Sequence, residues 1–142
     1  MTSLRLIVGK MSRENSGDFA VAYDRITAIT EQLGAQEVAH YLIYCCGRKG
    51  TLASTRWSKH ALTRYLDIPA RKAYLSEQRL IDAGFVTKVK KGKHPKFDIA
   101  PPEREEYLWL PKTFITGAAG EVPPLKLLWQ TGSVEVFRLM MD

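Results

Sequence analysis

The apolar residues in the first third of the chain recur at the spacing of helix faces. From residue 18 they follow at steps of three and four residues, at Phe19, Ala22, Ile26, Ile29 and Leu33. After Gly34 a second stripe begins, at Val38, Ala39, Leu42, Ile43 and Cys46. Such spacing places apolar side chains on one face of a helix. We therefore predict one helix from residue 18 and another over residues 35–46, ended by Gly47.

The middle of the chain predicts two more helices that are separated by a tight turn. Ser58 has a side chain that caps helix N-termini well, and a short helix is expected to follow it and to end near Leu66. The next helix is predicted over residues 70–83, because Pro69 is tolerated where a helix begins. Gly84 favours the left-handed conformation that ends many helices.

Two strand-like segments follow, FVTKVKK and KFDIA, and the turn between them contains Gly92 and several lysines. We expect a β-hairpin in which apolar residues face one another across the two strands, namely Phe85, Val86 and Val89 opposite Phe97 and Ile99. The fold class predicted from these elements is mainly α with a small β-hairpin.

The two ends of the chain carry weaker signals. Residues 1–17 are predicted to form an arm with a short strand at residues 4–8. YLWLPKTFI is strand-like but is broken by Pro111, and Pro124 is expected to open a helix. A last helix is predicted from Ser133, and its apolar side chains need cover from the first helix or from a second copy of the chain.

The predicted elements divide the chain into three parts. Residues 1–33 form an N-terminal arm and helix, residues 34–100 form the central unit, and residues 101–142 form a helical C-terminal extension. The last helix reaches Asp142 without the glycine or the basic residues that usually close a helix. We therefore expect the extension to be the start of a further region of a longer protein.

Composition limits the class of protein. With 142 residues, of which 45% are hydrophobic and 25% charged, the chain is expected to form one compact soluble domain with extensions. No apolar run approaches the roughly 18 residues that cross a bilayer, and the apolar stretch at the N-terminus is too short for a signal peptide. A cytoplasmic location is expected.

Positive charge is concentrated in one third of the chain. Residues 48–96 hold 13 lysines and arginines against 3 acidic residues, whereas the totals for the chain are 21 and 15. The rest of the chain therefore holds 8 basic and 12 acidic residues. A surface that only keeps a protein soluble mixes both signs, so this segregation favours an anionic partner.

Motifs for catalysis or for a metal site are not found in the sequence. Cys45 and Cys46 are adjacent, which makes buried reduced thiols the expected state and a redox pair the alternative. His40, His60 and His94 fall in different predicted elements. Neither a phosphate-binding Walker A pattern nor a G-x-S-x-G motif occurs. We expect no enzymatic activity, no metal and no cofactor.

The stretch LTRYLDIPARKAYLSEQRLIDAGFV resembles the winged helix-turn-helix superfamily of DNA-binding domains. The resemblance covers residues 35–100, about half the chain, and LIDAGF at residues 80–85 fits the closing part of the family's signature. Gly50 and Trp57-Ser58 give a weaker resemblance to N-terminal domains of plasmid and phage replication or regulatory proteins. The resemblance implies a winged helix-turn-helix fold and binding to double-stranded DNA.

In such a domain, residues 70–83 would be the recognition helix in the major groove, and the basic hairpin at residues 88–96 would be the wing on the DNA backbone. A homodimer is the other expected assembly, because two-fold symmetric regulators bind two half-sites. Transcriptional regulation is the predicted role. The alternatives are a replication initiator of a plasmid, phage or other mobile element, a protein-interaction module, and, ranked last, an effector-sensing regulator.

Helical periodicity within residues 70–83 supports the same orientation independently. At 100° per residue, Ala73, Leu80 and Gly84 form a core arc with Tyr74 and Ile81 beside it. The opposite side carries polar residues, namely Arg71, Lys72, Gln78, Arg79 and Asp82. Arginine can bind guanine through two hydrogen bonds, and glutamine can bind adenine in the same way. An ordinary solvated face is the alternative.

Two residues of this helix fit less simply. Glu77 falls in the core arc, where a carboxylate needs a partner, and Arg64 or Tyr65 is expected to supply it. Leu75 falls on the outward face, where it would contact a thymine methyl group or pack against another segment or subunit.

The lysines of the hairpin turn are expected to contact phosphates, because each such contact releases counterions from DNA. A lysine-rich edge that prevents strand aggregation is the alternative. The complete set of predicted DNA-contacting residues is Arg56, Lys59, Arg71, Lys72, Gln78, Arg79, Lys88, Lys90, Lys91, Lys93, His94 and Lys96.

Overall fold

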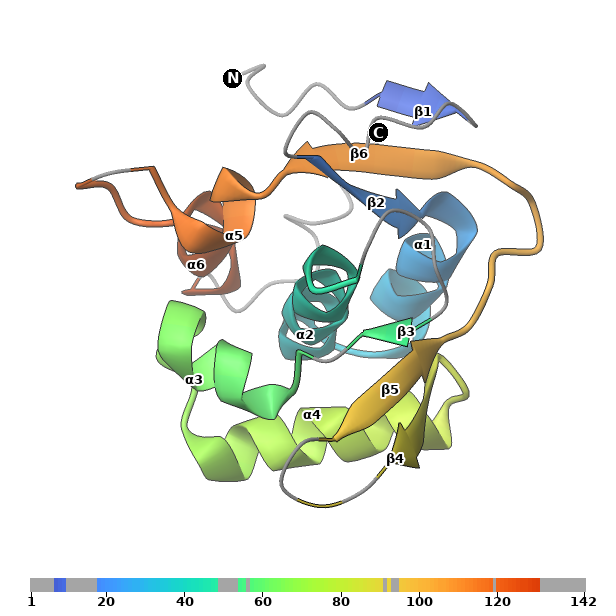
Figure 1. The fold of residues 1–142 in the computed structure, drawn as a ribbon, viewed down its shortest axis with the longest axis horizontal. Coiled ribbons are helices and arrows are strands. Elements are labelled where there is room, and N and C mark those ends of the chain that lie inside the picture. The colour runs from blue at the N-terminus through green and yellow to red at the C-terminus, as the bar shows by residue number, and fades with distance from the viewer. Residues whose placement is uncertain are drawn as a thin grey trace.

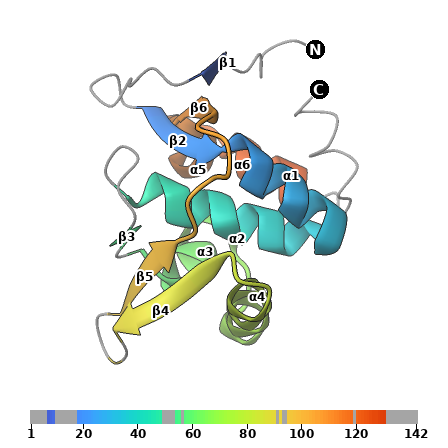
Figure 2. The same cartoon turned by 90° about the vertical axis from the view of Figure 1, so that its right-hand side faces the viewer.

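A computed structural model describes residues 7–9, 18–48, 54–55, 57–90, 92, 95–118 and 120–130. About half of these residues are helical, and the described strands form two small antiparallel sheets (Figure 1). The predicted class, mainly α with a small β-hairpin, is confirmed at this level. In both views one sheet lies at one end of the molecule, and the hairpin lies at the other end (Figures 1 and 2).

The first sheet joins segments from the two ends of the described chain. Its strand order is β1-β6-β2, with β1 at Ile7–Gly9, β6 at Tyr107–Pro111 and β2 at Asp18–Ala22. β6 pairs antiparallel with both neighbours, and Ala20 lies opposite Trp109. The strand-like character of residues 107–110 is thereby confirmed, and Pro111 occupies the last position of the strand.

The helix predicted from residue 18 begins later than expected. α1 spans Tyr23–Gln32, whereas the preceding five residues form β2. The last four residues of β2 are all buried, so the strand has apolar side chains on both faces. A short continuous apolar run of this kind also satisfies three- and four-residue spacing, which explains the wrong assignment.

α2 spans Ala35–Cys46 and lies between the two sheets (Figure 2). All its side chains except Gln36 are buried, as expected for a central helix. The helix ends before Gly47, where an added Cβ would lie 2.2 Å from Cγ of Trp57. Glycine is therefore required here by close packing, since its φ of −80° suits any residue.

The next two helices agree with the prediction. α3 spans Lys59–Leu66 and is capped by Ser58, whose Oγ accepts a hydrogen bond from the His60 N–H at 3.4 Å. α4 spans Ala70–Asp82 and is followed by Gly84 in the left-handed region at φ 85°. In the intervening turn Asp67 also has a left-handed φ, of 58°, which ends α3 sharply.

The predicted hairpin is present and carries an additional strand. β4 (Val86–Lys90) pairs with β5 (Lys96–Ile99), and β5 pairs on its other edge with β3 (Ser54–Thr55). The prediction that Val89 faces the apolar side of the hairpin is wrong. A bulge between Lys88 and Lys90 shifts the register, and Val89 is half exposed.

The C-terminal segment returns to the helices. α5 (Thr113–Thr116) follows β6, and α6 (Pro124–Gln130) begins at the proline that predicted it. Lys126 on α6 contacts the Asp67 carboxylate in the turn between α3 and α4, at 2.5 Å. The helix predicted from Ser133 lies outside the described residues. In the described ranges, no helix combines the length and apolar character needed to cross a bilayer.

Candidate nucleic-acid interface

α4 has one buried face and one exposed face, and their division follows the helical period. Ala73, Ser76, Glu77 and Leu80 are buried. Four residues on the opposite side share one line along the helix, at spacings of four, three and four residues, namely Arg71, Leu75, Gln78 and Asp82. Of these, only Gln78 is partly covered, and the other three are exposed. We call these four residues the outer stripe.

Tyr74 and Gly84 lie outside the core, contrary to prediction. Tyr74 is 50% exposed and its neighbour Leu75 is 48% exposed, so two large apolar side chains face solvent beside each other. Tyr74 lies at the border between the two faces of α4. The buried face is narrower than predicted and does not extend to this residue. Gly84 follows the end of the helix and is exposed.

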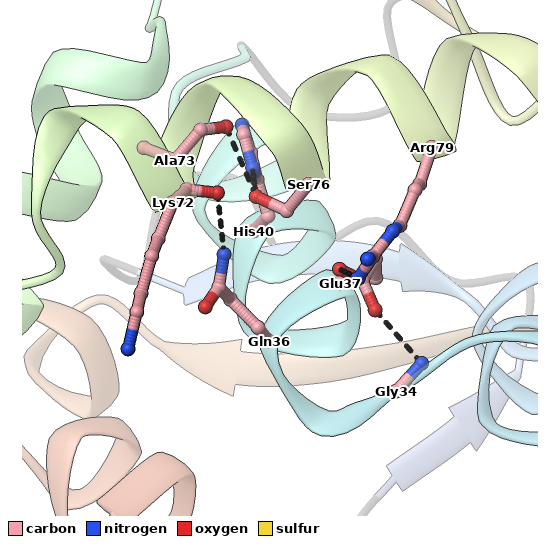
Figure 3. Close-up of polar contacts among 8 residues, drawn as sticks. All are labelled: Gly34, Gln36, Glu37, His40, Lys72, Ala73, Ser76 and Arg79. Carbon is pink, nitrogen blue, oxygen red and sulfur yellow. Dashed lines mark hydrogen bonds and ion pairs between the residues drawn. The ribbon is translucent and has the colours of Figure 1, made fainter.

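Polar contacts to α2 hold the inner side of α4 (Figure 3). The Gln36 amide Nε2 donates to the Lys72 carbonyl oxygen at 2.7 Å. One turn further along both helices, His40 Nδ1 lies 2.5 Å from Ser76 Oγ. Successive turns of α2 therefore contact successive turns of α4, which fixes where α4 lies along its axis.

His40 is buried and uncharged. Burial and, as the smaller cause, the positive charge of Lys59 together lower the pKa of His40 to about 3. The Ser76 hydroxyl donates to the Ala73 carbonyl at 3.1 Å, so the proton of the His40–Ser76 contact belongs to Nδ1 of the imidazole. Within the described part of the chain, His40 Nε2 has no hydrogen-bond partner.

Glu37 engages one of the predicted DNA-contacting cations. Its Oε1 accepts from the Gly34 N–H at 2.8 Å, and its Oε2 lies 3.3 Å from Nη1 of Arg79 (Figure 3). The Glu37 side chain is buried, whereas that of Arg79 is 61% exposed. Arg79 is therefore exposed to solvent, although one nitrogen of its guanidinium group pairs with Glu37.

The buried Glu77 carboxylate finds partners other than the predicted ones. The Tyr44 hydroxyl donates to Oε1 at 3.0 Å, and Nζ of Lys88 lies 3.2 Å from Oε2. Burial and the neighbouring carboxylate raise the pKa of Tyr44, so its hydroxyl remains protonated and donates. The prediction that Arg64 or Tyr65 pairs with Glu77 is wrong, because a helical wheel gives the direction of Glu77 but not what reaches it.

Among the wing lysines that the structure describes, Lys88 is the one paired with a buried acid. Its side chain is only 24% exposed, and its ammonium group lies 5.5 Å from the centre of the Phe97 ring as well as beside Glu77. We therefore separate Lys88 from the residues that are free to contact a partner.

The remaining predicted DNA-contacting cations that the structure describes lie on α4, on the hairpin and at the start of α3. Arg71 and Lys72 are exposed at the start of α4, Lys90 is exposed in β4, and Lys96 is partly exposed in β5. Lys59 is partly exposed at the start of α3. Among the ion pairs between described residues, none includes any of these five side chains. Four predicted contacts lie outside the described residues, namely Arg56, Lys91, Lys93 and His94.

The described cations of α4 and of the hairpin lie together at one end of the molecule. β4 lies beside α4, and both are remote from the β1-β6-β2 sheet (Figures 1 and 2). The sequence did not reveal the buried polar residues that join α4 to α2 beneath this surface, namely His40, Tyr44 and Ser76. The sequence signal that could have revealed them is their position, because each is a polar residue on the buried face of a helix.

The two cysteines of α2 lie in the interior of the protein. Cys45 and Cys46 are buried free thiols, as predicted. Burial raises the pKa of Cys46 to about 12 and also raises that of Cys45, so both are protonated at neutral pH. In the described part of the chain, no three His, Cys, Asp or Glu side chains gather as they would around a metal ion.

Comparison with known proteins gives no relative for this chain. No protein-family model, curated protein or solved structure matches it.

Proposed function

We propose that the chain binds double-stranded DNA as a winged helix-turn-helix domain. α3, the turn at residues 67–69 and α4 form the helix-turn-helix unit, and the β4–β5 hairpin forms the wing. α4 is the recognition helix, so its outer stripe enters the major groove while the hairpin follows the phosphate backbone. The order and lengths of the elements support this proposal.

The observation that carries the proposal is the distribution of unpaired cations. Arg71 and Lys72 on α4, and Lys90 on β4, are exposed and lie outside every ion pair between described residues. Repulsion among such groups is relieved when they approach a polyanion. Each phosphate contact also releases counterions from the duplex, which drives binding at moderate salt.

The outer stripe offers chemistry for reading bases as well. Arg71 can donate two hydrogen bonds to guanine, and Gln78 can both donate to and accept from adenine. Leu75 presents an apolar surface that suits the methyl group of thymine, and Asp82 can accept from the cytosine amino group. A single stripe of this composition distinguishes base pairs, which supports sequence-specific binding and a role as a transcriptional regulator.

A replication initiator of a plasmid, phage or other mobile element would use the same surface. The two roles share the binding chemistry and differ in what the bound protein recruits. A protein-interaction module is favoured by a separate observation, because two apolar side chains are half exposed, Leu75 on the outer stripe and Tyr74 at the border of that face. An acidic protein with apolar residues would then be the partner.

Fluorescence anisotropy with a labelled random duplex tests DNA binding directly. If about five phosphates are contacted, the logarithm of the association constant should fall with the logarithm of salt concentration at a slope of about −4.5. Polyglutamate serves as the competing polyanion. Binding to DNA that does not change between low and physiological salt would refute the proposal. Stronger displacement by polyglutamate than by unlabelled duplex would favour the protein-interaction role.

Sequence specificity is a separate measurement. Selection of bound duplexes from a random pool should converge on one motif, since the outer stripe discriminates bases. The affinity for that motif should exceed the affinity for random DNA by roughly a thousandfold or more. Failure to enrich any motif would limit the chain to general DNA binding.

A further inference from the structure

We propose that Glu77 is a positioning residue that fixes the wing relative to the recognition helix. The inference rests on the proposed DNA-binding function and extends it, because it assigns the joint geometry of the two DNA-contacting elements to one buried carboxylate. Glu77 itself contacts no DNA, since its side chain is fully buried.

Three elements meet at this carboxylate. Glu77 projects from α4, Tyr44 reaches its Oε1 from α2 at 3.0 Å, and Lys88 reaches its Oε2 from β4 at 3.2 Å. The second strand of the hairpin joins the same cluster through Phe97. The Tyr44 ring stacks on the Phe97 ring with centroids 4.8 Å apart, and the Lys88 ammonium lies 5.5 Å from the same ring.

An ion pair constrains this junction more tightly than apolar packing would. Removing one partner of a buried pair leaves an uncompensated charge, which is strongly destabilising, whereas apolar attraction has no preferred direction. Among the described residues, Lys88 is the cation that contacts Glu77. β4 must therefore hold the position that brings Lys88 to the carboxylate.

The bulge in the hairpin makes the position of Lys88 decisive for the end of β4. The register of β4 against β5 shifts between Lys88 and Lys90, immediately beyond the anchored residue. A bulge bends its strand and increases the local twist. The direction of β4 at Lys90 therefore depends on where Lys88 is held.

Both DNA-contacting elements must meet one duplex at the same time. A wing that is already fixed against α4 does not have to be ordered when DNA binds, so less of the contact energy is lost to ordering. The ion pair accordingly acts on affinity without touching DNA. The same geometry explains why Lys88, although basic and located in the wing, faces inward.

The substitution Glu77→Gln separates positioning from simple electrostatics. Glutamine has nearly the same shape and keeps an oxygen for the Tyr44 hydroxyl, but it cannot pair with Lys88. Removal of an acidic residue near a DNA-binding surface would by itself strengthen binding. Loss of positioning instead predicts that affinity for the selected duplex falls about tenfold, a usual size for coupling between two sites.

The matched control is Glu121→Gln, which makes the same charge change at an exposed residue between α5 and α6. It should leave the affinity unchanged or raise it slightly, with anisotropy measured at equal salt. If Glu77→Gln binds the selected duplex as tightly as Glu121→Gln does, Glu77 does not position the wing and the inference is overturned.

A measurement without DNA keeps the inference distinct from the proposed function. Amide hydrogen exchange should become faster in β4 and β5 of the Glu77→Gln variant, while exchange in β2 and β6 stays unchanged. Unchanged exchange in the hairpin would overturn the inference even if DNA binding fell. If the wild-type chain binds no duplex, the proposed function fails, and hairpin exchange alone decides whether Glu77 fixes the wing.

The double substitution Glu77→Gln with Lys88→Met covers the case in which the single variant does not fold. It removes both charges, leaves no unpaired buried charge and keeps the net charge of the chain unchanged. Positioning predicts a folded protein whose hairpin still exchanges quickly and whose affinity for the selected duplex is still about tenfold weaker. Binding and hairpin exchange at wild-type levels would show that the pair contributes only to folding.

Discussion

The buried His40 should make the stability of the fold depend on pH. In the folded chain its pKa is lowered to about 3, mainly by burial, whereas an unfolded histidine has its ordinary pKa of 6.5. The unfolded state therefore binds a proton that the folded state cannot accept. The contribution of His40 to stability is fully present above pH 6.5 and is lost as the pH falls toward 3.

The size of this effect follows from the two pKa values. Between pH 7.5 and pH 5.0 the unfolded His40 becomes almost fully protonated, while the folded one stays neutral. Linkage then lowers the free energy of unfolding by about 2 kcal/mol over this interval. Because His40 is buried against α4 and its Nδ1 proton is directed at Ser76, solvent screening does not reduce this value.

Urea unfolding at pH 7.5 and pH 5.0, followed by tryptophan fluorescence, measures the effect. The His40→Gln variant keeps an N–H donor for Ser76 but has no titrating group, so its free energy of unfolding should change by about 2 kcal/mol less than that of the wild type. His60→Gln is the control, because His60 is exposed on α3. Equal pH dependence in the wild type and His40→Gln would refute the account of a buried neutral imidazole.

The remaining predictions concern DNA contacts and local structure. Lys90→Ala should weaken binding to all duplexes alike and reduce the salt slope by about one unit, whereas Arg71→Ala should cost ~1–3 kcal/mol on the selected duplex only. Comparison of the two variants by anisotropy on selected and random DNA checks both. Gly47→Ala should lower the free energy of unfolding by about 2–3 kcal/mol, because its Cβ would lie 2.2 Å from Cγ of Trp57. Ser58→Ala should lose the N-cap of α3 and about 1 kcal/mol, measured by the same urea unfolding.

Elements with local boundary signals could be predicted from the sequence. Ser58, Pro69 and Gly84 act through the backbone within a few residues, so they indicated the limits of α3 and α4 correctly. The hairpin was equally clear, because two apolar segments flank a turn that contains Gly92. These signals do not depend on which other parts of the chain lie nearby.

Elements defined by distant partners could not be predicted in this way. β2 was assigned to a helix because its pairing partner, β6, lies more than eighty residues further along the chain. β3 has only two residues, and α5 has four, which is too short for a periodic pattern to be recognised. Short apolar runs become strands or helices according to what they pack against.

The candidate site shows the same limit at the level of side chains. The outward direction of Arg71, Gln78 and Asp82 was predictable from the helical period, and so was the inward direction of Glu77. The period could not show that Glu37 reaches Arg79, because the two residues are 42 positions apart. Which cations remain free for a partner was therefore decided by tertiary contacts.

Contacts on the buried side of α4 determine which of its residues face a partner. Gln36, His40 and Tyr44 are spaced one turn apart on α2, and each contacts a polar group of α4. Apolar packing alone specifies the rotation and position of α4 less sharply, since the hydrophobic effect is non-directional. A slip would separate the His40 imidazole from Ser76 and leave the Glu77 carboxylate buried without its partners, which costs far more than a lost apolar contact. The polar seam between α2 and α4 therefore keeps the outer stripe turned outward, and changes to buried residues there should alter recognition as effectively as changes on the surface.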